Sequence, residues 1–195
     1  MVKTAVLVSG GGLNLQSLLD AKLFGELPDC EIAAVISSKP DAYALIRAEA
    51  ARIPTYIIDR DMFPNEAVFS QAVSDKLKDL DIELVVLAGY DYLLPPSVFK
   101  RLSGRIIDTC PRFLSDEDEE KAGASAFFVT EDSSLCPVIL RQEVSLEGCG
   151  EDDTPGQRLL EGGENVVLPK AVSLFCSGRL CLEDGKVHIS ELAAP

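Results

Sequence analysis

The sequence predicts an α/β protein with a doubly wound, mainly parallel sheet and a small antiparallel C-terminal part. In the first half of the chain, short apolar runs rich in Val, Ile and Leu alternate with helical patterns. Such alternation implies parallel strands joined by helices that cover both faces of the sheet. In the second half, residues 124–129 and 137–144 carry alternating or apolar patterns with no helical pattern between them, which favours an antiparallel pair.

The elements of the first half follow from hydrophobic periodicity. Apolar residues every three to four positions indicate a helix, and a short continuous apolar run indicates a buried strand. In the last helix of this half, the apolar stripe places Val68, Ala72, Val73 and Leu77 inward. We predict strands at 4–9, 32–37, 55–58 and 84–88, and helices at 14–21, 41–51 and 65–80.

After residue 94 the pattern is less regular. Two adjacent prolines start a short helix at 95–102, because proline is favoured in the first helical turn. A C-terminal helical pattern interrupted by glycines predicts a broken helix that is capped by Gly178. An Asp-Gly pair between two short strands predicts a hairpin that turns at Asp184-Gly185. The other elements are a strand at 105–108, an acidic turn at 115–121, the broken helix at 154–160 and 166–177, and the hairpin at 179–189.

Composition excludes several classes of protein. The formal net charge is −14 and the sequence pI is near 4.4, which argues against nucleic-acid binding because phosphate backbones need clustered Lys and Arg. No apolar run approaches the roughly 20 residues of a membrane span. The N-terminal apolar run ends in glycines, as a first strand does and a signal peptide does not. We therefore expect a cytoplasmic protein that binds neither nucleic acid nor membrane.

The cysteines form no recognisable metal or disulfide pattern. They are scattered without a C-x-x-C pair, and the chain has one histidine, so neither a zinc site nor a disulfide framework is expected. We predict no bound metal and interpret the cysteines as mostly buried thiols. The six are Cys30, Cys110, Cys136, Cys149, Cys176 and Cys181.

The most informative motif is SGGGLNLQ, in which three glycines lie between a predicted strand and a predicted helix. Glycines let the backbone turn tightly and approach an oxyanion, and a helix N-terminus presents free N–H groups with a partial positive charge. The motif is neither G-x-G-x-x-G nor G-x-x-x-x-G-K followed by Ser or Thr. Its spacing leaves two interpretations open, a phosphate-binding loop and a tight turn without a ligand.

In order and spacing, four segments resemble the glycinamide ribonucleotide formyltransferase family of bacteria: AVLVSGGGLNLQSLLDA, EIAAVISSKPDAYALIRAEAARIPTYIIDR, ELVVLAGYDYLLPPSVFKRLSGRII and DDTPGQRLLEGGENVVLPKAVSLFCSGRL. This family takes a formyl group from 10-formyltetrahydrofolate in purine biosynthesis. The resemblance implies a single formyltransferase-like domain over 1–195. It consists of a Rossmann-like half at 1–111, which carries the phosphate loop, and a shortened C-terminal half at 112–195.

The resemblance implies that a phosphorylated ribose compound is held at the glycine loop. The family's phosphate-binding positions fall on Gly11, Gly12, Leu13 and Asn14, and the family has Ser or Thr where this chain has Leu13. The backbone N–H donors are unaffected by that change, whereas the side-chain hydroxyl is lost. The family's ribose-contacting glutamate falls on Glu164 if one extra residue is allowed around the Gly-Gly pair before it. The alternative interpretation of this residue is a solvated helix glutamate.

The catalytic positions depart from the family. Where family members have Asn-Ile-His-Pro, this chain has DTCP, so Asp108 and Cys110 replace the Asn and the His, and Ser134 replaces the acid–base Asp. An ionised aspartate repels a developing oxyanion, which an asparagine N–H stabilises, and loss of one such donor costs about 10²–10³ in rate. A new activity with Cys110 as nucleophile is an alternative, but it needs a nearby cation or histidine. The one histidine is His188.

The folate-binding region is altered as well. Family members commonly have G-F-M-R-I-L where this chain has GYDYLL. Tyr92 replaces a basic residue and Asp91 adds a negative charge, which changes the contacts offered to the cosubstrate 10-formyltetrahydrofolate. The candidate folate-contacting residues are Tyr90, Asp91, Tyr92, Leu93 and Leu94.

These observations predict a phosphoribosylglycinamide formyltransferase-like protein of purine biosynthesis whose transfer activity is weak or absent. A site for a phosphorylated ribose compound is retained, and 10-formyltetrahydrofolate is the cosubstrate if transfer remains. One alternative is a working transferase in which a protonated Asp108, or water, moves the proton. Another is a non-enzymatic ligand-binding or regulatory protein, which forms a homodimer or associates with an active paralogue. Whether the chain is an enzyme stays open at the level of sequence.

Overall fold

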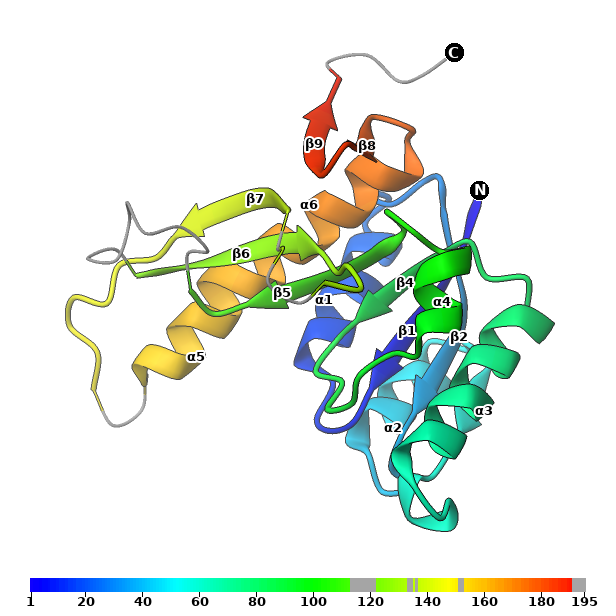
Figure 1. The fold of residues 1–195 in the computed structure, drawn as a ribbon. Helices are drawn as coiled ribbons and strands as arrows, with labels where there is room; N and C mark the ends of the chain where they lie inside the picture. The colour runs from blue at the N-terminus through cyan, green and yellow to red at the C-terminus, as the bar shows by residue number, and fades with distance from the viewer. Residues whose placement is uncertain (113–121, 133–134, 136, 151–152, 191–195) are drawn as a thin grey trace.

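A seven-stranded sheet in the order β3-β2-β1-β4-β5-β6-β7 forms the centre of the fold (Figure 1). The structure is a computed structural model that describes residues 1–112, 122–132, 135, 137–150 and 153–190. β1 to β5 pair in parallel, and β6 and β7 add two antiparallel strands at one edge. The predicted fold class is confirmed. The strands are β1 Val2–Val8, β2 Cys30–Ser37, β3 Thr55–Ile57, β4 Leu84–Leu87, β5 Ile106–Cys110, β6 Gly123–Phe128 and β7 Val138–Glu143.

Helices cover both faces of the sheet and bury its central strands (Figure 1). Side chains alternate between the faces along a strand, so Val6 of β1 packs under one helical layer and Leu7 under the other, and both are fully buried. Burial on both faces explains why these strands are apolar throughout. One layer contains α1 Leu13–Leu23, α2 Tyr43–Ala50 and α6 Asn165–Cys176, and the other contains α3 Glu66–Asp79 and α4 Pro96–Arg101, with a 3-10 turn η1 Arg60–Met62 before α3.

Both antiparallel pairs predicted from the sequence are confirmed. β6 and β7 pair with each other and extend the main sheet beyond β5. The closing hairpin, β8 Leu180–Glu183 and β9 Lys186–Ile189, forms a separate two-stranded sheet that turns at Asp184-Gly185. Figure 1 shows this hairpin beyond the C-terminal end of α6. The acidic turn predicted at 115–121 lies outside the described residues.

The C-terminal helix differs from the predicted broken helix, because the backbone remains helical across the two glycines. α5 Pro155–Leu159 continues through one π-helical turn, η3 Leu160–Glu164, directly into α6. A π turn accommodates one extra residue within a helix, so the interruption in the pattern corresponds to a wider helical turn and not to a break. The predicted cap is confirmed: Gly178 has a φ of 71°, and its N–H and that of Arg179 bond to the carbonyl oxygens of Phe175 and Leu174.

One predicted core residue is wrong. Val68 was expected to point inward from α3, but its side chain is 46% exposed. Phe69, Val73 and Leu77 form the buried stripe instead, at the i, i+4 and i+8 spacing of one helix face. Val68 is one residue away from that stripe, which turns it by about 100° around the helix axis.

The prediction that the cysteines are mostly buried is also wrong for the part of the chain that the structure describes. Cys30 at the start of β2 is buried, Cys181 is exposed, and Cys110, Cys149 and Cys176 are intermediate. The thiols that are not fully buried lie at the ends of β5 and α6, in the loop before α5 and on the hairpin. Cys136 is outside the described residues.

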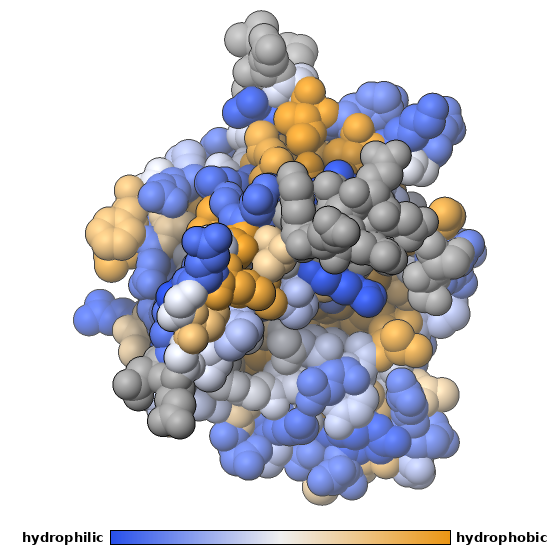
Figure 2. All heavy atoms as spheres, turned by 90° about the vertical axis from the view of Figure 1, so that its left-hand side faces the viewer, coloured by the Kyte–Doolittle hydropathy of each residue, from blue (hydrophilic) through white to orange (hydrophobic). Residues whose placement is uncertain are grey.

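The face seen from the left of Figure 1 carries both hydrophilic and hydrophobic patches (Figure 2). Hydrophilic side chains dominate the lower part of that view, and hydrophobic ones gather in its middle and upper parts. Among the described helices, none combines the length and the apolar character that a membrane span requires.

The two adjacent glycines of the π turn should differ in their tolerance of a side chain. A Cβ atom on Gly163 would lie 2.7 Å from Cβ of Ala124, whereas one on Gly162 would make an ordinary 3.6 Å contact with Val144. We expect Gly163→Ala to reduce the free energy of unfolding by about 1–3 kcal/mol through overpacking. Gly162→Ala is the matched control and should change it by less than about 1 kcal/mol. Urea unfolding of both variants measures the difference, and equal values would contradict the close packing of η3 on β6.

Candidate functional site

The predicted site residues gather at the carboxyl ends of the central parallel strands. The glycine loop follows β1, the segment 89–94 follows β4, and Asp108 lies near the end of β5. β1 has β2 on one side and β4 on the other, so the chain reverses its strand order here. Ligands of open α/β sheets bind in the crevice at such a switch point.

Close packing against α2 holds the glycine loop in place. Gly12 has a φ of 72°, and a Cβ atom at this position would lie 2.6 Å from Cβ of Ala44. Only glycine fits that conformation and that distance. At Gly10 and Gly11, by contrast, an added Cβ would meet nothing within 4 Å. The first two glycines therefore leave open space above the loop, while Gly12 is required by packing.

The loop turns its carbonyl groups inward and leaves its amides free. The carbonyl oxygen of Gly10 accepts a hydrogen bond from Ala44 N–H at 3.1 Å, and that of Gly11 accepts one from Arg47 Nε at 2.9 Å. Within the described chain, no group accepts a hydrogen bond from the backbone N–H groups of 10–14. Free N–H groups at the start of a helix, beside an arginine, form an environment that favours an anion.

Two hydroxyls connect this loop to the neighbouring strands. Ser9 Oγ lies 2.6 Å from Ser38 Oγ, beyond the end of β2, and accepts a hydrogen bond from Asp91 N–H at 3.0 Å. Asp91 also forms an ion pair with Lys39 at 2.7 Å. The three segments that follow β1, β2 and β4 are thus fixed relative to one another.

A polar cluster lies beside the first turn of α1. Asn14 Nδ2 donates to Oε2 of Glu164 at 3.1 Å and to Oγ1 of Thr109 at 3.4 Å. The Thr109 hydroxyl donates to the same Oε2 of Glu164 at 2.7 Å. Glu164 thus contacts the end of the glycine loop and β5, which does not fit the alternative of a freely solvated helix glutamate. Oδ1 of Asn14 is buried and accepts no hydrogen bond within the described chain.

Asp108 lies next to this cluster with an unusual affinity for protons. Burial raises the pKa of its carboxyl group from 3.8 to about 7. The hydrogen bond that Oδ1 accepts from Thr109 N–H, at 2.7 Å, opposes the increase, and the negative charge of Glu164 adds to it. With its pKa raised this far, Asp108 keeps its proton, and thus an O–H donor, to a much higher pH than an ordinary aspartate does. The ionised form expected from the sequence is therefore disfavoured at this position.

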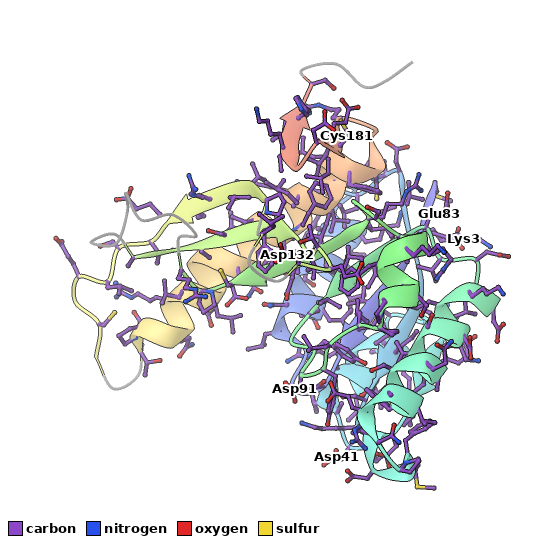
Figure 3. The ribbon with its side chains drawn as sticks, in the orientation of Figure 1. Lys3, Asp41, Glu83, Asp91, Asp132 and Cys181 are labelled. Atoms are coloured by element: carbon purple, nitrogen blue, oxygen red, sulfur yellow. The ribbon has the colours of Figure 1, made fainter. Side chains whose placement is uncertain are left out.

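The alternative of a cysteine nucleophile finds no support. Burial raises the pKa of the Cys110 thiol, so the thiolate is disfavoured. His188 pairs with Cys181 across the terminal hairpin, and Figure 3 shows Cys181 at the far end of the molecule from Asp91. The structure does not bring Cys110 and His188 together. Ser134, the third predicted catalytic position, lies outside the described residues.

All five candidate folate-contacting residues line one pocket of about 440 Å³, and Asp108 lies on its wall. The ring of Tyr92 makes edge-to-face contacts with the rings of Phe69 and Tyr90, at centroid distances of 4.9 Å and 5.9 Å. These contacts anchor this wall of the pocket in the core. Burial raises the pKa of the Tyr90 hydroxyl, and no described group hydrogen-bonds to it. The lining residues from the predicted segment are Tyr90, Asp91, Tyr92, Leu93 and Leu94.

Residues 2–117 match the formyl transferase family. The whole chain is 33% identical, over 207 residues, to phosphoribosylglycinamide formyltransferase from Haemophilus influenzae, and the match covers 97% of that protein. The chain belongs to the formyl transferase family. Its fold matches glycinamide ribonucleotide transformylase 1 from Symbiobacterium toebii with a TM-score of 0.86 and 32% identity, over 98% of this chain and 95% of that one. The phosphoribosylglycinamide formyltransferase of Escherichia coli is 29% identical over 97% of this chain and 94% of that protein.

Two side chains of this formyl transferase were not singled out by the sequence analysis. Thr109 joins Glu164 to β5, and Arg47 holds the glycine loop and also donates to Gln16 at 2.9 Å. The only sequence signal for Thr109 is its position within the altered DTCP motif. Arg47 looks like an ordinary helix arginine in the sequence. In the part of the chain that the structure describes, no group of His, Cys, Asp and Glu side chains could hold a metal ion.

The raised pKa of Asp108 predicts a pH-dependent cost to folding. Its folded-state pKa of about 7 exceeds the usual 3.8, so stability is greatest below the unfolded value and falls as the pH rises through about 7. Asp108→Asn removes this cost because an amide does not ionise. The melting temperature of the variant is compared with that of the unchanged chain at pH 4.5 and at pH 8.5. We expect the difference between the two proteins to be larger at pH 8.5, by about 2–4 °C or more, in favour of the variant. A difference that is constant over this range would contradict the raised pKa.

Proposed function

We propose that this formyl transferase binds glycinamide ribonucleotide through its glycine loop and transfers formyl groups to it slowly. The observation that carries the proposal is the bonding pattern of the loop: the carbonyl groups of Gly10 and Gly11 accept hydrogen bonds from α2, and the loop N–H groups have no acceptor within the described chain. A phosphate dianion gains most from several N–H donors at a helix start. In a chain with a net charge of −14, such local donors are needed to hold an anion at all.

In this proposal Gly11, Gly12, Leu13 and Asn14 hold the phosphate through their backbone, and Glu164 contacts the ribose. Leu13 contributes only its N–H group, and its side chain is 45% exposed. A carboxylate is an acceptor for hydroxyl donors, and Glu164 is held beside the same helix turn by Asn14. Phosphate and ribose sites are therefore adjacent, as a ribose phosphate requires.

The pocket beside Asp108 is the proposed site of 10-formyltetrahydrofolate, which supplies the formyl group. Its aromatic and apolar wall suits a flat heterocycle. Asp108 lines this pocket and is close enough to Glu164 to interact with its charge. A formyl carbon in the pocket and an amine beside the ribose would thus meet near Asp108.

The slow rate follows from the groups at the reacting centre. Protonated Asp108 can donate a hydrogen bond to the formyl oxygen, whereas ionised Asp108 repels negative charge there. Cys110 stays a thiol at neutral pH because burial raises its pKa, so it is a poor base for the proton that leaves the amine. The working alternative, with a protonated Asp108, is therefore favoured over complete inactivity below pH 7.

Binding is best tested with a variant that folds normally. Gly12→Trp is unsuitable, since any side chain at this position collides with Ala44. Gly11→Val adds a side chain where an added Cβ meets nothing within 4 Å. We expect it to weaken glycinamide ribonucleotide binding more than about tenfold by obstructing the amides. Calorimetric titration measures the affinity.

A melting curve is the control for this experiment, because Gly11→Val should leave the melting temperature unchanged within about 2 °C. Equal affinity of Gly11→Val and the unchanged chain would rule out the loop as the phosphate site. No heat at millimolar ligand with the unchanged chain would exclude substrate binding, and a regulatory or partner role would then be favoured.

Restoring the family residues should restore transfer. For the double variant Asp108→Asn, Cys110→His we expect formyl transfer to increase about 10²-fold or more, since an amide donor and an imidazole base return to the reacting centre. The unchanged chain should lose its residual activity as the pH rises through about 7, and Asp108→Asn should abolish that loss. Formation of tetrahydrofolate, followed at pH 6 and pH 8, measures both effects. Residual activity that rises with pH would contradict the role of protonated Asp108.

A further inference from the structure

We propose that Thr109 is a positioning residue that presets Glu164 for the ribose hydroxyls, so that the site prefers ribose 5-phosphate to phosphate alone. This inference rests on the proposed function, because it deepens the assignment of Glu164 to the ribose. Its basis is the hydrogen bond of 2.7 Å from the Thr109 hydroxyl to Oε2 of Glu164, the shortest within the polar cluster.

The two donors on Glu164 act on the same oxygen. Thr109 Oγ1 and Asn14 Nδ2 both donate to Oε2, and no described group donates to Oε1. An ionised carboxylate has acceptor capacity on both oxygens. Because both protein donors bond to Oε2, Oε1 is left to accept hydrogen bonds from the hydroxyls of a ligand. The same two bonds fix the plane of the carboxylate.

Thr109 is rigid enough to impose this geometry. It is 9% exposed and pairs with Ala126 in the ladder between β5 and β6. Its β-branched side chain has restricted χ1 freedom. Its backbone N–H is occupied by Asp108. The hydroxyl thus projects from a fixed strand, whereas Glu164 has a long, flexible side chain.

Glu164 needs such a restraint because of its position. It is the last residue of the π turn, and its charge interacts unfavourably with Asp108. Repulsion between the two carboxylates favours conformations of Glu164 that point away from Asp108. Two hydrogen bonds from α1 and β5 oppose that tendency, and the bond from Thr109 is the stronger of the two by its length.

The resulting selectivity is separable from phosphate binding. The glycine loop holds the phosphate through backbone groups that Thr109 does not contact, whereas ribose contacts require Glu164. Loss of the Thr109 hydroxyl should therefore weaken the binding of ribose 5-phosphate and leave that of inorganic phosphate unchanged. A general disturbance of the fold would weaken both.

The test compares the dissociation constants of inorganic phosphate and ribose 5-phosphate by calorimetry. For Thr109→Val, which keeps the shape and removes the hydroxyl, we expect the preference for ribose 5-phosphate to fall about tenfold. Thr109→Ser should retain the preference. Thr4→Val is the matched control, since Thr4 is a buried strand threonine whose hydroxyl bonds to Val2, and it should retain the preference as well.

The Glu164→Ala background supplies the second measurement. If Thr109 acts through Glu164, Thr109→Val should have no further effect on the preference in that background. An unchanged preference in Thr109→Val alone, or an equal loss of affinity for both ligands, overturns the inference and leaves the proposed function intact. Absence of any preference in the unchanged chain overturns the ribose assignment of Glu164 itself.

Discussion

The approach of the glycine loop to α2 is the contact on which the rest of the site depends. Gly12 lies so close to Ala44 that a Cβ atom cannot be added, and this packing brings the loop carbonyl groups within hydrogen-bonding distance of Ala44 and Arg47. With the carbonyl groups of Gly10 and Gly11 bonded to α2, the loop N–H groups are left without an acceptor in the described chain. The three glycines therefore serve different purposes: Gly12 satisfies packing, whereas Gly10 and Gly11 keep the surface above the amides clear.

Binding and chemistry are electrostatically coupled in this arrangement. The negative charge that makes Glu164 an acceptor for hydroxyl groups also raises the pKa of Asp108. A ligand that donates hydrogen bonds to Glu164 favours the charged form of that carboxylate, so its effect on Asp108 persists. Burial of Asp108 is the larger cause of its raised pKa, so the carboxyl retains much of its proton affinity when Glu164 is engaged. Because Asp108 retains its proton so readily, an aspartate at this position disturbs the site less than a permanently charged carboxylate would.

The strands, helices and turns that depend on short local patterns could be predicted from the sequence. The run TAVLVS and the glycines after it locate β1 and the loop, because burial on both faces and a tight turn each leave a signature within a few residues. Val68 was assigned wrongly because a shift of one position in a helix rotates a side chain by about 100°. The contact between Asn14 and Glu164 joins residues 150 positions apart, and it depends on how α6 packs against α1. No periodicity encodes that distance, and only the resemblance to a family pointed to Glu164.

The π turn explains how the chain tolerates an extra residue before Glu164. In a regular helix, one extra residue would rotate all following residues by about 100° around the helix axis. Either the apolar stripe of α6 would then leave the core, or Glu164 would lose its hydrogen-bond partners. The wider turn absorbs the insertion, so Val167 and Leu168 stay buried while Glu164 reaches Thr109 and Asn14. Gly163 allows this turn to pack on Ala124 of β6. The π turn, Thr109 and Asp108 thus all act on the position or the charge environment of one carboxylate, that of Glu164.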